Sequence, residues 1–121
     1  MTAARSRTGA WRISRSDKAA PKQIARLLRA LRRRSGFSSF YASLPIAGRD
    51  GTLAGRMRSG PAHNRCHAKT GTLSDVSALS GYCVNRSGRT LIFSVLNNRT
   101  NVYNARAVQD RVAQALAGSR G

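Results

Sequence analysis

The residues best suited to chemistry form the run Lys69-Thr70-Gly71-Thr72, at the head of a segment that alternates toward a strand. Lys69 is one of only three lysines among the 22 basic residues of the chain. At the end of a strand, its ammonium would supply charge and the Thr70 hydroxyl a directed hydrogen bond, while Gly71 would let another backbone lie against the strand edge. These residue types suit the binding of a substrate carboxylate. A strand-end lysine without such a role is the alternative left open.

Zinc is a second chemistry to weigh, because four residues have side chains of the kind that bind it: His63, Cys66, His67 and Cys83. Their spacing is not that of a zinc finger, since one cysteine lies far from the other three residues, inside a predicted strand. Two loop histidines and a buried thiol explain the same residues. Two cysteines do not make a disulfide framework either. We therefore predict no metal site and no cofactor.

Nucleophilic catalysis needs a serine or cysteine beside a base, with hydrogen-bond donors for an oxyanion. The chain has no Gly-x-Ser-x-Gly turn, and its only acids are four aspartates, so an aspartate-oriented histidine is hard to assemble. We identify no catalytic residue in this chain.

Two helices are predicted before this region. The segment 21–34 begins with proline, which suits a first helical turn, and carries apolar residues at i, i+3, i+4 and i+7. A second segment, 37–44, has apolar residues at helical spacing and is stopped by Pro45. The apolar positions are Ile24, Leu27, Leu28 and Leu31, followed by Phe37, Phe40, Tyr41 and Leu44.

From residue 67 the period changes to two, which predicts strands beginning at 67–70 and running over 77–85 and 90–97. An amphipathic helix is predicted after them, with Asn104 as its N-cap. Its apolar positions are Ala105, Val108, Val112, Ala115 and Leu116. This order predicts an α+β fold with helices packed on a short antiparallel sheet.

The charge of the chain is unusual, at a formal +18. Such a field attracts polyanions, including nucleic acid, anionic membranes and teichoic-acid-like polymers. Because the arginines are spread along the chain, we prefer a coding bias, or a fragment parted from acidic neighbours, as their explanation. The polar face of the first helix carries Arg26, Arg29, Arg32 and Arg33, as a solvated or a phosphate-binding face. A small basic nucleic-acid-binding protein is thus the alternative function.

Targeting features are missing from the sequence as written. No run approaches the roughly 20 apolar residues that span a bilayer. The first 18 residues carry charge but no apolar core of a secretory signal. The chain as written is therefore expected to stay in the cytoplasm.

Three stretches in order, "SLPIAGRDGTL", "AKTGTLSDVSALSGYC" and "GRTLIFSVLNN", resemble the C-terminal end of a known enzyme family. It comprises the serine-type D-Ala-D-Ala carboxypeptidases of the penicillin-binding protein 4 kind, peptidase family S13. The preceding "ISRSDKAAPKQIARLLRAL" resembles the Leu-Ser-Arg…Pro…helix segment of that family. The resemblance runs from about Ile13 to Ala117.

This resemblance implies a partial penicillin-binding transpeptidase-like fold that ends in a helix, and a site on the third motif of the family, Lys-Thr-Gly. Lys69 and Thr70 would bind the terminal carboxylate of a D-Ala-D-Ala peptide or of a β-lactam, and Gly71 would give clearance. Thr72 would offer its N–H to the oxyanion hole and its hydroxyl to the carboxylate. The family works outside the cytoplasmic membrane on peptidoglycan peptides.

The sequence departs from the family in two motifs. No lysine has a serine three positions before it, and no asparagine has one two positions before it, so Ser-x-x-Lys and Ser-x-Asn are absent. We interpret residues 1–12 as a basic, disordered arm, 13–117 as the C-terminal part of a catalytic domain, and 118–121 as a tail. Without the nucleophile motif, the chain alone is expected to be inactive.

Overall fold

The computed structural model describes residues 3–5, 11–13, 20–72, 76–98 and 102–121. The predicted α+β fold is confirmed, with a three-stranded antiparallel sheet at its centre. The elements, in chain order, are β1 (Ala3–Arg5), β2 (Trp11–Ile13), α1 (Ala20–Leu31), α2 (Phe37–Ser43), the 3-10 helix η1 (Gly51–Leu53), β3 (Cys66–Thr72), β4 (Val76–Val84), β5 (Thr90–Asn98) and α3 (Val102–Gly118).

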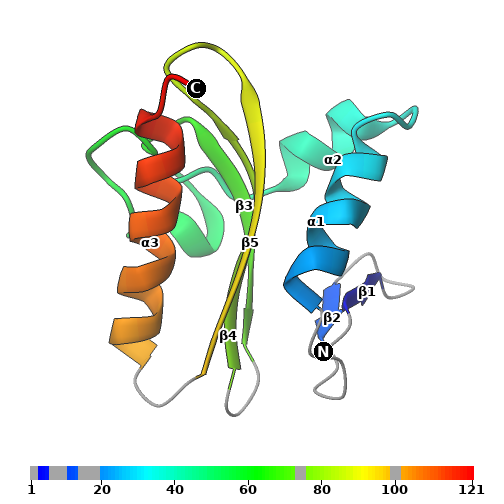
Figure 1. Ribbon diagram of the computed structural model, residues 1–121. Helices are drawn as coiled ribbons and strands as arrows, with labels where there is room; N and C mark the ends of the chain where they lie inside the picture. Colours follow the sequence, from blue (N-terminus) through cyan, green and yellow to red (C-terminus); the bar gives the residue numbers. More distant parts are fainter. Residues whose placement is uncertain (1–2, 6–10, 14–19, 73–75, 99–101) are drawn as a thin grey trace.

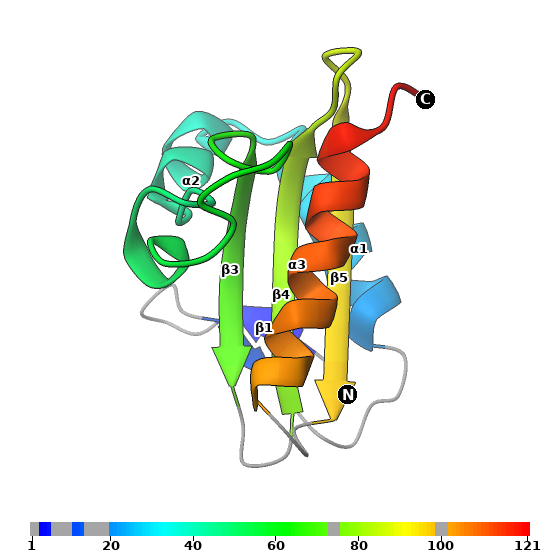
Figure 2. The same cartoon turned by 90° about the vertical axis from the view of Figure 1, so that its left-hand side faces the viewer.

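The molecule has three layers. The strand order is β3-β4-β5, so β4 lies in the middle of the sheet. Helix α3 covers one face of the sheet, and α1 and α2 lie on the other side (Figure 1). The view in Figure 2 looks onto the face that α3 covers. Because successive residues of a strand point to opposite faces, β4 serves two separate cores.

The core under α3 contains odd-numbered residues of β4, such as Leu79 and Cys83. Against them pack small residues of α3, Ala113 and Ala117, together with Leu53 of η1. All five side chains are fully buried. Alanines on the helix let its backbone come close to the sheet.

The core on the opposite face is built around Tyr82, which is fully buried beneath α1 and α2. Its hydroxyl donates a 2.6 Å hydrogen bond to the carbonyl oxygen of Leu28 in α1. Burial raises the pKa of Tyr82 to about 12, so this hydroxyl keeps its proton over the ordinary pH range. Six of the eight predicted apolar positions of the first two helices belong to this core or pack against it: Ile24, Leu28, Phe37, Phe40, Tyr41 and Leu44. Leu27 and Leu31 were predicted with them, but they are only half-buried and lie outside this core.

Helix α3 differs from the prediction in two respects. It begins at Val102, so Asn104 lies inside the helix and is not its N-cap. The buried face is rotated as well: Val108 is 42% exposed, whereas the polar Gln109 is fully buried. The Gln109 amide nitrogen donates to Ser77 Oγ and Asn97 Oδ1, at 3.1 and 3.2 Å. A glutamine with these partners is satisfied against the sheet, which apolar periodicity alone does not reveal.

Residues near both ends of the chain form hydrogen bonds that the sequence did not predict. Strands β1 and β2 pair with each other, and all their residues except Ile13 fall in the segment 1–12 predicted to be a disordered arm. Residues 1–2 and 6–10 of that arm lie outside the described residues, so its disorder stays a prediction. At the other end, residues after α3 bind the β4–β5 turn: Arg86 N donates to the Ser119 carbonyl at 3.0 Å.

The pairing of β3 with β4 includes a very close approach between Gly81 and Ala68, which are directly opposite each other. A Cβ atom on Gly81 would lie 2.2 Å from the His67 carbonyl oxygen and 2.6 Å from Ala68 Cα. These are backbone atoms, so they could give way only if the strands moved apart.

Substituting Gly81→Ala is therefore expected to lower the free energy of unfolding by about 2 kcal/mol or more, because it overpacks a strand interface. Denaturant unfolding followed by circular dichroism measures the change. Gly55→Ala is the matched control: its added Cβ would meet nothing within 4 Å, so stability should hardly change. Equal stabilities of the two variants would contradict the close approach.

Candidate functional site

The predicted site residues lie on β3, the edge strand of the sheet. On its outer side, the first half of β3 bonds a preceding loop: Ala47 N donates to Cys66 O at 2.9 Å and Ala68 N donates to Pro45 O at 3.0 Å. After Ala68, no strand pairs with this side of β3 in the part of the chain that the structure describes. The Lys69–Thr72 stretch therefore lies along an open edge.

The direction of the backbone groups follows from the register. Cys66 and Cys83 are opposite each other, and Val84 N donates to Arg65 O at 3.0 Å, so the cysteine pair exchanges no backbone hydrogen bonds. Antiparallel pairs alternate between bonded and non-bonded positions. The N–H and C=O groups of Thr70 and Thr72 therefore point away from β4, toward the open edge.

The side chains of the site lie close to this edge. Lys69 Nζ donates a 2.7 Å hydrogen bond to the Thr70 carbonyl oxygen, one of the groups directed at the edge. Thr70 Oγ1 donates to Thr52 Oγ1 of η1 at 3.0 Å. Both side chains are half-buried. For Thr72 the structure gives the backbone position, opposite Ser77, and the side chain lies outside the described residues.

Thus Lys69, Thr70 and Gly71 are brought together on one strand, with the Thr72 backbone beside them. The contact from Thr52 was not predicted from the sequence. Its only signal is the polar "DGT" turn of residues 50–52, which could be placed beside β3 only after the fold was known.

His67 precedes Lys69 by two residues and so lies on the same face of β3. Its ring stacks on Tyr41 of α2, with ring centroids 4.0 Å apart and planes 16° from parallel. Nδ1 lies 3.4 Å from the Tyr41 carbonyl oxygen. Burial lowers the pKa of His67, while the hydrogen bond to Tyr41 and the charge of Asp50 oppose this effect more weakly. His67 is therefore a neutral packing partner at neutral pH.

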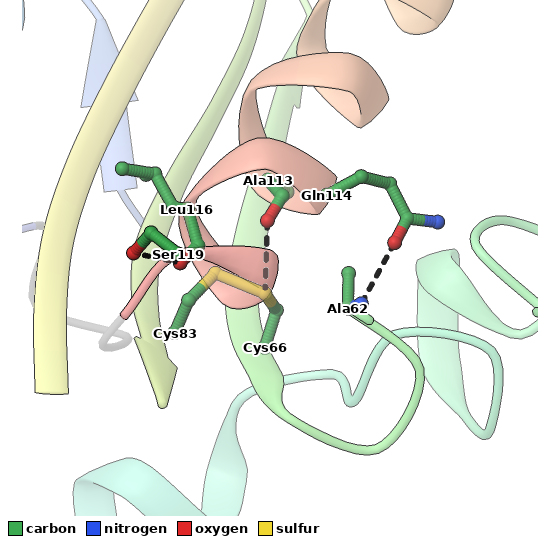
Figure 3. The surroundings of a disulfide bond; sticks show 7 residues. All are labelled: Ala62, Cys66, Cys83, Ala113, Gln114, Leu116 and Ser119. Atoms are coloured by element: carbon green, nitrogen blue, oxygen red, sulfur yellow. Dashed lines mark hydrogen bonds between the residues drawn. A yellow bond between two sulfur atoms is a disulfide. The ribbon is translucent and has the colours of Figure 1, made fainter. Parts of the chain in front are cut away.

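The cysteines are joined, which corrects the expectation of a buried free thiol. Cys66 and Cys83 form a disulfide with their Cα atoms 4.1 Å apart, and both are fully buried. Figure 3 shows the bond beneath the last turns of α3, where Cys66 Sγ lies 3.9 Å from the Ala113 carbonyl oxygen. This pairing could have been predicted from the sequence, because a hairpin centred between positions 74 and 75 places residue 66 opposite residue 83.

The four residues considered for zinc do not converge on one point. His67 stacks on Tyr41, and the two cysteines bond each other. His63 Nδ1 is buried without a hydrogen-bond partner, against the backbone of Gly48. Within the described residues, no group of three or more His, Cys, Asp or Glu side chains could hold a metal ion.

Comparisons with known proteins agree on one family. Residues 11–118 match the family described as D-Ala-D-Ala carboxypeptidase 3 (S13). The chain is 47% identical over 88 residues to the D-alanyl-D-alanine carboxypeptidase of Actinomadura sp. strain R39. That alignment covers 69% of this chain and 16% of the relative, so the chain spans about a sixth of that enzyme.

Solved structures give the same result. Penicillin-binding protein 4 from Haemophilus influenzae superposes with a TM-score of 0.70 at 28% identity, over 83% of this chain and 24% of that protein. The same protein complexed with a β-lactam superposes with a TM-score of 0.67 at 29% identity, over 86% of this chain and 26% of that one.

The stacked pair gives a test of the site electrostatics. In an NMR titration, His67 is expected to show a pKa below 6.5, and Tyr41→Ala should raise it because the imidazole becomes hydrated. Because the pKa of His67 is lower in the folded chain than in the unfolded chain, the unfolded chain binds the proton more tightly. The free energy of unfolding is therefore highest above about pH 6.5 and decreases as the pH falls from there through the folded-state pKa. Tyr41→Phe keeps the ring and should keep the low pKa. A wild-type pKa at or above 6.5 would contradict this account.

Proposed function

The chain belongs to the D-Ala-D-Ala carboxypeptidase 3 (S13) family, and we propose that it is the C-terminal part of a D-alanyl-D-alanine carboxypeptidase or endopeptidase. Such an enzyme would act on peptidoglycan peptides through a serine acyl-enzyme. The observation that carries the proposal is the Lys69-Thr70-Gly71-Thr72 run on an open strand edge, with the backbone groups of Thr70 and Thr72 directed outward.

Each residue of this run has a role that its position supports. The Lys69 ammonium and the Thr70 hydroxyl would bind the terminal carboxylate of a D-Ala-D-Ala peptide, as charge-assisted hydrogen bonds. In the structure both groups bond other atoms of this chain, so a carboxylate would compete with the Thr70 carbonyl and with Thr52. The N–H of Thr72 would donate to the oxyanion of the tetrahedral intermediate. Gly71 would leave room for the substrate backbone.

The chain supplies binding groups but no nucleophile. Ser-x-x-Lys and Ser-x-Asn are absent from the sequence, so the acyl-enzyme must form on a serine outside this chain. Binding contacts alone do not support acyl transfer at enzymatic rates. The isolated chain is therefore inactive, and its residues act only together with the remaining part of such an enzyme.

The partners and the compartment follow from the same proposal. β-Lactams resemble the natural peptide in their carboxylate, and one is bound in the structure of the Haemophilus influenzae relative. Action outside the cytoplasmic membrane is supported by the Cys66–Cys83 disulfide, because disulfides persist in oxidising compartments. Within the described residues no helix is long and apolar enough to cross a bilayer. Cytoplasmic retention of the chain as written stays a prediction.

A chimera tests the proposal. Residues 11–118 would replace the matching segment of Haemophilus influenzae penicillin-binding protein 4, and release of D-Ala from a D-Ala-D-Ala peptide would be measured. We expect activity in the chimera and its loss by about 100-fold or more on Lys69→Ala, since a carboxylate contact in the transition state is removed.

Lys22→Ala is the matched control, because Lys22 is exposed on α1 away from the strand edge. The chimera should retain its activity with this change. Equal activity of the two lysine variants would refute the role of Lys69. Stoichiometric acylation of the isolated chain by a labelled penicillin would refute its inactivity.

A second function, non-specific polyanion binding, is favoured by one feature of α1. Arg26, Arg29 and Arg33 line a shallow hollow of about 180 Å³ on the outer face. The two aspartates with described positions are engaged elsewhere: Asp50 accepts from Ile46 N, and Asp110 pairs with Arg56 at 2.6 Å. No described acid therefore neutralises this arginine face.

Binding of double-stranded oligonucleotides is expected to ignore sequence and to weaken steeply with salt, because counterion release drives it. Replacing the three arginines of this face by glutamine should reduce the slope of log K against log salt by about 2–3. The matched control replaces the exposed Arg86, Arg89 and Arg120, which removes the same charge elsewhere. Sequence preference, or an equal effect of both triple variants, would contradict a role of the α1 face.

A further inference from the structure

The Cys66–Cys83 disulfide closes the β3–β4 hairpin at the end opposite its turn. Every site residue lies inside the loop that this bond closes, since Lys69–Thr72 falls between the two cysteines in the sequence. The bond joins two residues that are directly opposite in the register. It therefore allows only one alignment of β3 against β4.

Side-chain packing specifies this alignment only weakly. Cross-strand pairs of large side chains normally stabilise one register over others. Between the disulfide and the turn, four of the six β3–β4 pairs contain a glycine, alanine or serine. These four pairs are Ala68↔Gly81, Lys69↔Ser80, Gly71↔Ala78 and Thr72↔Ser77, and the other two are His67↔Tyr82, beside the disulfide, and Thr70↔Leu79.

The other side of β4 is different. There, large apolar residues face each other, as in Leu79↔Val95 and Tyr82↔Ile92. The β4–β5 register is thus held by side chains, whereas β3, beyond His67, pairs with β4 mainly through glycine, alanine and serine. The loop bonds to β3 from Pro45 and Ala47 reach only as far as Ala68.

A slip of one residue would exchange the two faces of β3. At present Lys69 shares the face of His67, which contacts α2, and Thr70 shares the face of Ala68, which is buried in the core under α3. After a slip, Lys69 would point toward α3, and the backbone groups of Thr70 and Thr72 would turn from the open edge toward β4. The site would be lost although the strand remained paired.

We infer that the Cys66–Cys83 disulfide is a positioning device that fixes the register of β3 and thereby places Lys69, Thr70 and Thr72 at the open edge. That this edge binds a substrate rests on the proposed function. Gly81 adds a second constraint at the same end of the hairpin, because only a glycine fits against Ala68.

Amide hydrogen exchange by NMR, on the full chain, separates this role from general stabilisation. By the alternation of the register, the amides of Lys69 and Gly71 donate to β4, whereas those of Leu79 and Gly81 donate to β5. In the Cys66→Ala/Cys83→Ala variant, the amides of Lys69 and Gly71 should exchange faster relative to those of Leu79 and Gly81. The ratio of the first rate to the second should rise about tenfold. The Hα–Hα contact between Thr70 and Leu79 should weaken.

Ile24→Ala is the matched control, because it destabilises the core on the other face of the sheet. It should accelerate exchange in both pairs alike and leave their ratio unchanged. If the alanine pair does not fold, Cys66→Val/Cys83→Val keeps apolar volume in the same positions without the covalent bond. It should show the same rise in the ratio.

An unchanged ratio with an intact Thr70–Leu79 contact would overturn the inference, since the disulfide would then stabilise the whole fold. Failure of both cysteine variants to fold would overturn it for the same reason. None of these measurements uses a substrate. The chimera and the labelled penicillin test the proposed function separately, so failure of one does not imply failure of the other.

Discussion

Burial of β4 on both faces is the constraint on which the other elements depend. Leu79 and Cys83 fill the core under α3, and Tyr82 fills the core under α1 and α2. The burial of apolar area on both sides is the main favourable free energy that a chain of this size has available. Among the described strands, β3 pairs only with β4, and it is held further by the loop before it and by the stacking of His67 on Tyr41. The candidate site is thus built on an edge strand of the sheet.

Much of this architecture could be predicted from periodicity. Ile24 and Leu28 mark the buried face of α1, and Pro45 follows the end of α2 as expected. These predictions succeed because the residues that repeat are large and apolar. The strand run after Lys69 was found for a similar reason, since its alternation of small and apolar residues has no helical period.

The features that were not predicted have a common physical origin, because each depends on residues that are distant in the sequence. Gln109 is buried because Ser77 and Asn97 satisfy its amide, and Arg56 donates to its oxygen at 3.1 Å. Judged by apolar character alone, Val108 would be a better core residue than Gln109. The contact of Thr52 with Thr70 depends in the same way on the position of a distant loop, whereas the disulfide follows from the β3–β4 register. The sequence therefore identified the candidate motif but not the contacts that hold it in place.

The disulfide has a practical consequence for following this protein in solution. The chain contains two cysteines, and both are consumed in a buried bond beneath α3. A single cysteine introduced on the surface would then be the one free thiol for a maleimide dye or a spin label. Attached beside the open edge of β3, such a probe would report on whatever docks there without any background from native thiols.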